Sequence, residues 1–121
     1  MWQYSQKSGT ISRVTPPPFE GHGYSGYGQG RNNGAMEAVA DIGPIPCGLY
    51  EIGPSYQHIH LGPIVMNLTP VAHDAHGRTL FRIHGDNATG DASHGCIIQA
   101  RPTREEIDKS VVKDRFLTVV P

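Results

Sequence analysis

Short apolar runs recur along the chain, and turn-forming residues separate them. In Trp2–Gln6 the aromatic side chains alternate with polar ones, which is the pattern of a strand with one buried face. The turn formers Lys7-Ser8-Gly9 follow, so this run and the next one predict a hairpin. Further strands are expected at Thr10–Val14, Leu49–Ile52, Ile64–Thr69, Thr79–Ile83, from Ile97 onward, and at Arg115–Val120.

Two short segments favour helix. Thr103 stands three residues before Glu106, which is the spacing of a capping box, so a helix is expected from Thr103 as N-cap to about Lys109. Ala35–Val39 is expected to form one helical turn. Gly43–Pro46 should be extended, because a residue before proline avoids the helical region. The whole pattern predicts one mostly-β domain, a sandwich or partial barrel with one or two short helices.

Composition and charge narrow the classes of function. The 121 residues include 10 Lys and Arg against 11 Asp and Glu, which gives a net charge of −1. No basic excess is present to neutralise phosphates, which argues against a nucleic-acid partner. No apolar run reaches the roughly 18 residues that span a bilayer, and the N-terminus lacks the charged start and apolar centre of a signal peptide. We therefore expect a protein made in the cytoplasm without a signal peptide and without membrane insertion.

The densest group of reactive residues lies between two expected strands. His84 ends one apolar run and Cys96 begins the next, so pairing of the two strands would bring the side chains together. A thiolate is the reactive form of cysteine, and a neighbouring histidine can take its proton and later return it to a leaving amine. Gly95 lets a substrate approach the backbone, where the amides of Gly95 and Cys96 would hold an oxyanion. Either the carbonyl of Gly85 or the carboxylate of Asp86 would orient the imidazole.

These residues resemble the signature of the L,D-transpeptidases, in which a His-Gly pair precedes a loop and then Ser/Thr-His-Gly-Cys. The chain has His84-Gly85 and then Ser93-His94-Gly95-Cys96. More of its length is similar to the small type VI secretion effectors with L,D-transpeptidase-like domains. The segments that carry this similarity are Met1–Gln6, Gly23–Asn33, Gly43–Ile52 and Ile83–Asp86.

The resemblance implies an L,D-transpeptidase-like fold over residues 1–121 and assigns roles to the motif. Cys96 would be the nucleophile and His84 the general base, oriented by the backbone carbonyl of Gly85. The amides of Gly95 and Cys96, joined by that of His94, would form the oxyanion hole. Supporting roles fall to Ser93 and Asp86, with Ser93 bracing the loop.

The sequence departs from the housekeeping enzymes in two ways. The loop from His84 to Cys96 is shorter, and the arginine often found shortly after the cysteine is absent, since Ile97-Ile98-Gln99 follows. Recognition of the substrate carboxylate must therefore come from elsewhere. Candidates are the polar residues of the glycine-rich segment Gly21–Gly34, itself either a mobile loop or an ordered surface for a polar ligand, and the strand before His84. The residues concerned are Tyr24, Arg31, Asn32, Asn33 and Arg82.

The function that the resemblance implies is antibacterial. The enzyme would cleave or exchange the bond between meso-diaminopimelate and D-alanine in tetrapeptide stems through a Cys96 thioester, without a cofactor or metal. Its partners would be peptidoglycan stem peptides, components of a secretion apparatus and a cognate immunity protein. It would act in the periplasm of the target bacterium, as an L,D-carboxypeptidase or an L,D-transpeptidase.

Two other functions remain open at this point. A zinc-dependent cell-wall peptidase would use side chains of the types that bind zinc, although no HExxH pattern is present; they are His58, His60, His73, Asp74 and His76. A non-catalytic cell-wall binding module would stack aromatic rings on sugars; the rings are those of Trp2, Tyr4, Tyr24 and Tyr27. Cys47 is expected to be an incidental turn residue, with both cysteines free thiols in the active protein.

Overall fold

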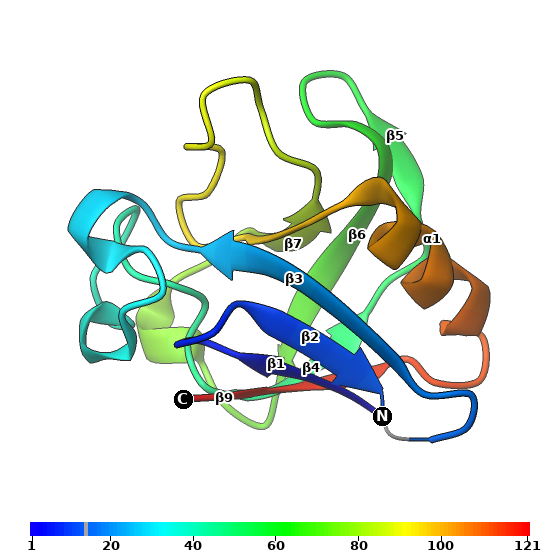
Figure 1. The fold of residues 1–121 in the computed structure, drawn as a ribbon. Helices are drawn as coiled ribbons and strands as arrows, with labels where there is room; N and C mark the ends of the chain where they lie inside the picture. Colours follow the sequence, from blue (N-terminus) through cyan, green and yellow to red (C-terminus); the bar gives the residue numbers. More distant parts are fainter. Residues whose placement is uncertain (14) are drawn as a thin grey trace.

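The computed structural model describes residues 1–13 and 15–121, so the predicted end of the second strand at Val14 lies outside the described residues. The described chain has nine strands and one α-helix (Figure 1). They are β1 (Trp2–Ser5), β2 (Thr10–Arg13), β3 (Phe19–Ser25), β4 (Gly48–Ile52), β5 (Tyr56–His58), β6 (Gly62–Val71), β7 (Phe81–His84), β8 (Ile97–Gln99), α1 (Arg101–Ser110) and β9 (Phe116–Val120). Short 3-10 turns lie at Gly28–Gly30, Gly34–Met36 and Ala75–Gly77.

The strands form one sheet that closes on itself. Their order is β4-β9-β1-β2-β3-β8-β7-β6-β5, and β4 also pairs with β6, so every strand except β5 belongs to a closed ring. Most neighbours are antiparallel, but β1 pairs with β9 and β7 pairs with β8 in parallel. The mostly-β prediction is confirmed, and of its two forms the barrel describes the molecule.

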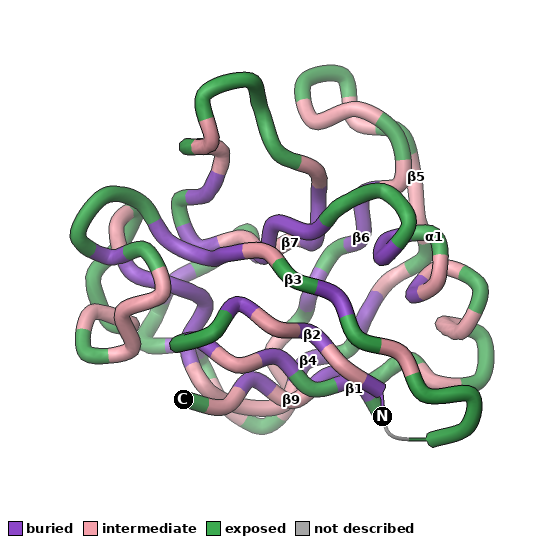
Figure 2. Tube along the Cα trace, viewed as in Figure 1, coloured by how far each residue is buried: buried purple, intermediate pink, exposed green. Residues whose placement is uncertain are grey.

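The first strand shows why the alternating pattern predicted correctly. Trp2 and Tyr4 are fully buried inside the barrel, whereas Gln3 between them is exposed. The indole Nε1 of Trp2 donates to Ser110 Oγ at 2.9 Å, so burial leaves its polar atom paired. Burying a side chain of this size contributes about 1.5–3 kcal/mol. Figure 2 shows the buried residues along the strands and the exposed ones in the loops above them.

The rings proposed for sugar stacking therefore serve mainly the core. Trp2, Tyr4 and Tyr24 are all buried. Tyr27 alone of the four is exposed, at 39%, and its ring stacks on His94 with centroids 5.0 Å apart. The aromatic residues do not form a surface platform.

The helix begins earlier than the capping box predicted. α1 starts at Arg101 with Ala100 as N-cap, and Pro102 occupies its first turn, where a missing N–H costs nothing. The assignment of Thr103 as N-cap was wrong because this residue is buried inside the helix, where it packs on Gly21 of β3. Contact with the barrel thus decided the position of the helix.

The glycine-rich segment Gly21–Gly34 is largely regular structure. Its first part forms β3, and its remainder includes the turn Gly28–Gly30 and the start of a second turn. Asn32 Oδ1 accepts from the amide of Ser25 at 3.2 Å, and Asn33 caps the turn that follows. Of the two alternatives for this segment, a mobile loop or an ordered surface, the structure has the ordered one. The helical turn expected at Ala35–Val39 is the 3-10 turn Gly34–Met36.

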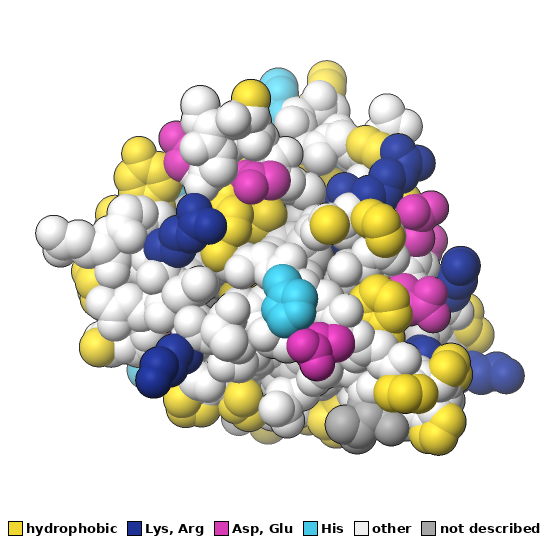
Figure 3. Space-filling model, in the orientation of Figure 1, with side chains coloured by type: hydrophobic (Ala, Val, Ile, Leu, Met, Phe, Trp, Pro, Cys, Tyr) yellow, Lys and Arg dark blue, Asp and Glu magenta, His cyan; other side chains and the backbone are white. Residues whose placement is uncertain are grey.

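The surface carries charges of both signs. On the face shown in Figure 3, basic and acidic side chains are interspersed over the strands and loops. No helix among the described residues is both long and apolar enough to cross a membrane.

Substitution of Gly21 tests the contact that fixes the helix. A Cβ at Gly21 would collide with the side chain of Thr103, so Gly21→Ala should lower the free energy of unfolding by about 1–3 kcal/mol. Adding Thr103→Ala should recover part of this loss, because the colliding atoms are removed. Gly53→Ala is the control, since its Cβ would meet nothing closer than 3.6 Å. Urea unfolding that shows no coupling between Gly21 and Thr103 would contradict the assigned contact.

Candidate active site

The parallel pairing of β7 and β8 places the two reactive residues on one face. Ile83 pairs with Ile97, and both are fully buried in the barrel. Side chains alternate along a strand, so His84 and Cys96 point to the opposite, outer face. Extending the register by one residue sets Cys96 across from Arg82. The predicted pairing of the two strands is present, and it brings His84 and Cys96 to the same face.

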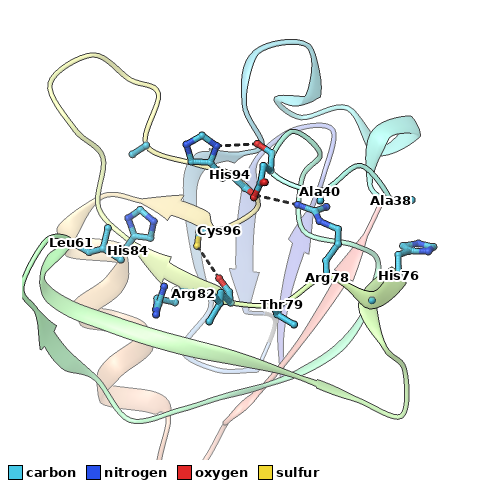
Figure 4. Close-up of a pocket in the computed structure, with 14 residues that line it drawn as sticks. Ala38, Ala40, Leu61, His76, Arg78, Thr79, Arg82, His84, His94 and Cys96 are labelled. Carbon is cyan, nitrogen blue, oxygen red and sulfur yellow. Dashed lines mark hydrogen bonds between the residues drawn. The ribbon is translucent and has the colours of Figure 1, made fainter.

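A cavity of about 510 Å³ lies at this outer face (Figure 4). Both reactive side chains line it, with Arg82 beside them. Its other walls come from the loop before β4, from the turn between β5 and β6, from the segment that leads into β7, and from the loop between β7 and β8. The lining residues are Ala38, Ala40, Asp41, Leu61, His76, Gly77, Arg78, Thr79, Leu80, Arg82, His84, Ala92, His94 and Cys96.

His84 is held in one orientation by its own neighbour. Its Nδ1 lies 2.8 Å from the carbonyl oxygen of Gly85, and its side chain is buried, with 2% of the residue exposed. A carbonyl only accepts hydrogen bonds, so Nδ1 carries the proton and Nε2 of the neutral ring is the acceptor. Asp86, the other group considered for this role, instead accepts from the Tyr24 hydroxyl at 2.5 Å and from the Asn87 amide.

Burial keeps both reactive groups uncharged at rest. Desolvation lowers the pKa of His84, and the charges of Arg104 and Arg82 act in the same direction, although the Gly85 carbonyl opposes them. Desolvation raises the pKa of Cys96, against the nearby charges of Arg82 and Arg78. The Cys96 thiol donates a weak hydrogen bond to the Leu80 carbonyl at 3.6 Å. The resting pair is thus a thiol and a neutral imidazole.

Ser93 braces the loop that ends in Cys96. It is fully buried, and its hydroxyl donates to the Cys96 carbonyl at 2.6 Å. The same oxygen accepts from the amides of Gly26, at 2.8 Å, and Gly95, at 3.2 Å. Among the described residues, the amides of His94 and Cys96 have no acceptor. Of the three amides predicted for an oxyanion hole, that of Gly95 is therefore engaged at rest.

These motif residues lie within a segment that matches a known family. The family model of the Tlde1 domain matches residues 20–121. The chain belongs to the Tlde1 domain family. This is a family of type VI secretion L,D-transpeptidase effectors that target peptidoglycan. No curated protein matches the chain.

Arg78 is the residue of this Tlde1 domain that the sequence did not reveal. Its guanidinium is buried and donates to four carbonyl oxygens. Three belong to Glu37, Pro44 and Gly43, at 2.6, 2.8 and 3.0 Å, and the fourth is that of His94, at 3.2 Å. Arg78 therefore ties the loop that ends in Cys96 to the loop before β4. An arginine that follows a turn is expected to be a solvent-exposed charge, so the sequence gives no indication that Arg78 is buried.

Each glycine of the motif lies against a buried guanidinium. A Cβ at Gly95 would lie 2.5 Å from a terminal nitrogen of Arg78, and its φ of 131° also favours glycine. A Cβ at Gly85 would lie 2.8 Å from a terminal nitrogen of Arg104. Arg104 in turn donates to the carbonyls of Gln99, Pro63 and Ile64. The two glycines are thus needed for packing as well as for approach to the backbone.

Four of the five predicted substrate-binding residues lie outside the lining of the cavity. The Tyr24 hydroxyl also accepts from the Ala92 amide at 3.0 Å, and the Arg31 guanidinium stacks on the Tyr24 ring at 3.7 Å. Arg31 also donates to the Gly90 carbonyl at 2.9 Å. Tyr24 and Arg31 thus support the loop between β7 and β8, whereas Asn32 and Asn33 bond within their own segment, to Ser25, Gln29 and Ala35. Contact of these four residues with substrate stays a prediction. Arg82 is the one that lines the cavity.

The residues considered for zinc are engaged separately. His73 lies 2.9 Å from the Leu49 carbonyl, and His76 lies 2.7 Å from a Glu37 carboxylate oxygen. Asp74 caps the turn that contains His76, and the His58 ring accepts from the amides of His60 and Leu61. Within residues 1–13 and 15–121 no three His, Cys, Asp or Glu side chains gather to hold a metal.

The second cysteine has a different environment. Both cysteines are free thiols in the structure. Cys47 precedes β4, and its amide donates to Glu37 at 3.2 Å. Burial, with the nearby negative charge of Glu37, raises the pKa of Cys47 to about 11. The carboxylate beside this thiol disfavours the thiolate, which is consistent with an incidental turn residue.

The pH dependence of alkylation tests the neutral resting pair. Burial raises the pKa of Cys96, so its reaction with iodoacetamide should keep accelerating with pH beyond the ordinary thiol value of 9.0. The measurement uses a Cys47→Ser variant, in which Cys96 is the remaining thiol. A rate that reaches its plateau below pH 7 would show a thiolate–imidazolium pair and contradict this assignment.

Proposed function

We propose that this Tlde1 domain is a cysteine peptidase that removes the terminal D-alanine from tetrapeptide stems of peptidoglycan. The observation that carries the proposal is the arrangement of His84. Its Nδ1 is fixed by the Gly85 carbonyl, which leaves Nε2 as a proton acceptor in the same cavity as Cys96. Family membership supports an enzymatic effector that acts on the cell wall.

The first half of the reaction forms a thioester. The proton of the Cys96 thiol passes to His84 Nε2 as the sulfur attacks the carbonyl carbon between meso-diaminopimelate and D-alanine. The free amide of Cys96 donates to the resulting oxyanion. When the intermediate collapses, the C–N bond breaks and His84 returns the proton to the amine of D-alanine. The tripeptide stem then remains on the sulfur.

The second half releases the stem. His84 takes a proton from water as the water oxygen attacks the thioester carbon, and the proton then returns to the sulfur as the C–S bond breaks. The products are a tripeptide and the free thiol, which is L,D-carboxypeptidase action. If the amine of a D-amino acid attacks instead, a new amide forms and the enzyme acts as an L,D-transpeptidase.

The neutral resting pair suits this sequence of proton transfers. A general base must start unprotonated, and burial lowers the pKa of His84 so that the imidazole is neutral near pH 7. Protonation during attack then creates an imidazolium that the Gly85 carbonyl stabilises at 2.8 Å. The geometry lets one histidine serve as base and then as acid.

The charges on either side of His84 suit a peptide with both signs of charge. A smaller cavity of about 270 Å³ shares Leu61, His84, Ala92 and His94 with the larger one. The smaller cavity carries the carboxylates of Asp86 and Asp91. The larger one carries the guanidinium groups of Arg78 and Arg82 together with the carboxylate of Asp41. The side chain of meso-diaminopimelate ends in an ammonium and a carboxylate on one carbon, and D-alanine ends in a carboxylate. A stem peptide that crosses His84 would place its ammonium near Asp86 and Asp91 and the carboxylate of D-alanine near Arg82.

We further propose that the protein acts in the periplasm of the target cell. Tetrapeptide stems occur there, and the family is delivered by type VI secretion. The producing cell then needs a cognate immunity protein, which would cover the cavity at His84 and Cys96. Arrival at the target would depend on components of the secretion apparatus.

Incubation with purified tetrapeptide muropeptides tests the proposed reaction. The products should lose the mass of one alanine residue, and Cys96→Ala should abolish the loss because no nucleophile remains. His84→Ala should slow the reaction by about 10²- to 10⁴-fold, since general base catalysis is removed. Cys47→Ala is the matched control and should keep wild-type activity. Unchanged muropeptides from folded wild-type protein, or equal turnover by Cys96→Ala, would contradict the proposal.

A further inference from the structure

Arg82 is the basic residue next to the nucleophile. It lies on β7, directly across from Cys96 on the outer face, and its half-buried side chain lines the larger cavity beside His84 (Figure 4). Neighbouring strands are about 4.8 Å apart, so this position places a guanidinium within reach of any group bound next to the sulfur.

The Arg82 side chain is held by neighbours at one end. Its Nε donates to the Tyr56 hydroxyl at 3.1 Å. That hydroxyl donates in turn to Asn67 Oδ1 at 2.6 Å. Asn67 is the cross-strand partner of Arg82 between β6 and β7, and Tyr56 lies on the adjacent β5. The three residues thus form a short chain across neighbouring strands, and it fixes the plane of the guanidinium.

The two terminal nitrogens of Arg82 remain available. Neither makes a hydrogen bond or ion pair with a group in residues 1–13 or 15–121. Arg78 is the other arginine of the cavity, and both of its terminal nitrogens already donate hydrogen bonds, to four carbonyls in all. Arg31 lies outside the lining and donates to the Gly90 carbonyl. Arg82 is therefore the arginine of this cavity with an unoccupied pair of donors.

The substrate has a matching group at a matching distance. In a tetrapeptide stem the carboxylate of D-alanine belongs to the residue just beyond the bond that Cys96 would cleave. Consecutive Cα atoms are 3.8 Å apart, so this carboxylate lies about one residue from the sulfur. A guanidinium with two parallel N–H groups suits a carboxylate better than an ammonium does, because it donates two hydrogen bonds at once.

We propose that Arg82 binds the terminal carboxylate of the stem peptide, and that Tyr56 and Asn67 are positioning residues for its guanidinium. The inference rests on the proposed function, and it adds the residue that would determine substrate specificity. The enzyme would select stems whose last residue has a free carboxylate, and would remove that single residue. Arg82 would thus take the place of the arginine that is absent after Cys96.

A pair of substrates tests this inference. The first is the disaccharide tetrapeptide, and the second is the same molecule with its terminal carboxylate converted to an amide. Wild-type protein should have a kcat/KM about 10- to 100-fold lower for the amide, the range expected when charge-assisted hydrogen bonds are lost. Arg82→Gln should lower kcat/KM for the free acid and reduce this ratio to about one. The ratio separates carboxylate binding from any effect of Arg82 on Cys96, because the latter acts on both substrates equally.

Two further variants test the positioning residues. Tyr56→Phe keeps the ring and removes the hydroxyl, so it should reduce the ratio only in part and act mainly through KM. Arg82→Lys keeps the charge without the paired donors, and should also give an intermediate ratio. Arg115→Gln is the matched control, since this exposed arginine lines neither cavity, and it should leave the ratio unchanged.

The possible failures are distinguishable. If wild-type protein cleaves neither substrate, the proposed function is wrong. If it cleaves both substrates equally, or if Arg82→Gln keeps the wild-type ratio, the reaction stands and the role of Arg82 is wrong. If Tyr56→Phe matches the wild type in ratio and KM, Arg82 acts without the positioning that we assign to Tyr56.

Discussion

The parallel pairing of β7 with β8 is the constraint on which the site depends. Strands paired in parallel cannot be joined by a tight turn, so the chain must leave the end of β7 and return to the start of β8. The connecting loop therefore begins directly after His84 and ends with Cys96. The pairing of β7 with β8 buries Ile83 and Ile97, and it also turns the side chains of His84 and Cys96 outward. The same strand pairing thus determines both the packing of the core and the geometry of the site.

Buried guanidinium groups stabilise the irregular parts around this pair. A buried charge is costly unless its donors are satisfied. Arg78 meets this requirement with four carbonyls, all from loops. Arg104 meets it with three, those of Gln99 in β8 and of Pro63 and Ile64 in β6. Each guanidinium leaves room only for a glycine beside it, at Gly95 and Gly85. The glycines of the motif and the buried arginines are therefore interdependent, although only the glycines belong to the recognised signature.

The sequence predicted the parts of the fold where a local pattern and the final packing agree. The alternation of Trp2–Gln6 reports burial directly, and β1 formed as expected. β3 was missed because its glycines conceal the strand pattern, yet Gly23 is required there by close approach to the Ile98 backbone. The N-terminus of α1 was misplaced because burial of Thr103 against the barrel outweighed a local capping signal.

The site, like the fold, has some features that a local sequence pattern predicts and others that depend on tertiary packing. The common position of His84 and Cys96 could be predicted, since the paired strand ends bring them to one cavity. The role of Arg78 could not be predicted, because its carbonyl partners at Glu37, Gly43 and Pro44 are far from it in the sequence.

The most direct measurement of the central claim is mass spectrometry of the intact protein after incubation with a tetrapeptide muropeptide and rapid acid quenching. The account predicts a tripeptide stem attached to Cys96, absent from Cys96→Ala. An adduct on Cys47, or turnover without any adduct at Cys96 under conditions that trap thioesters, would contradict it.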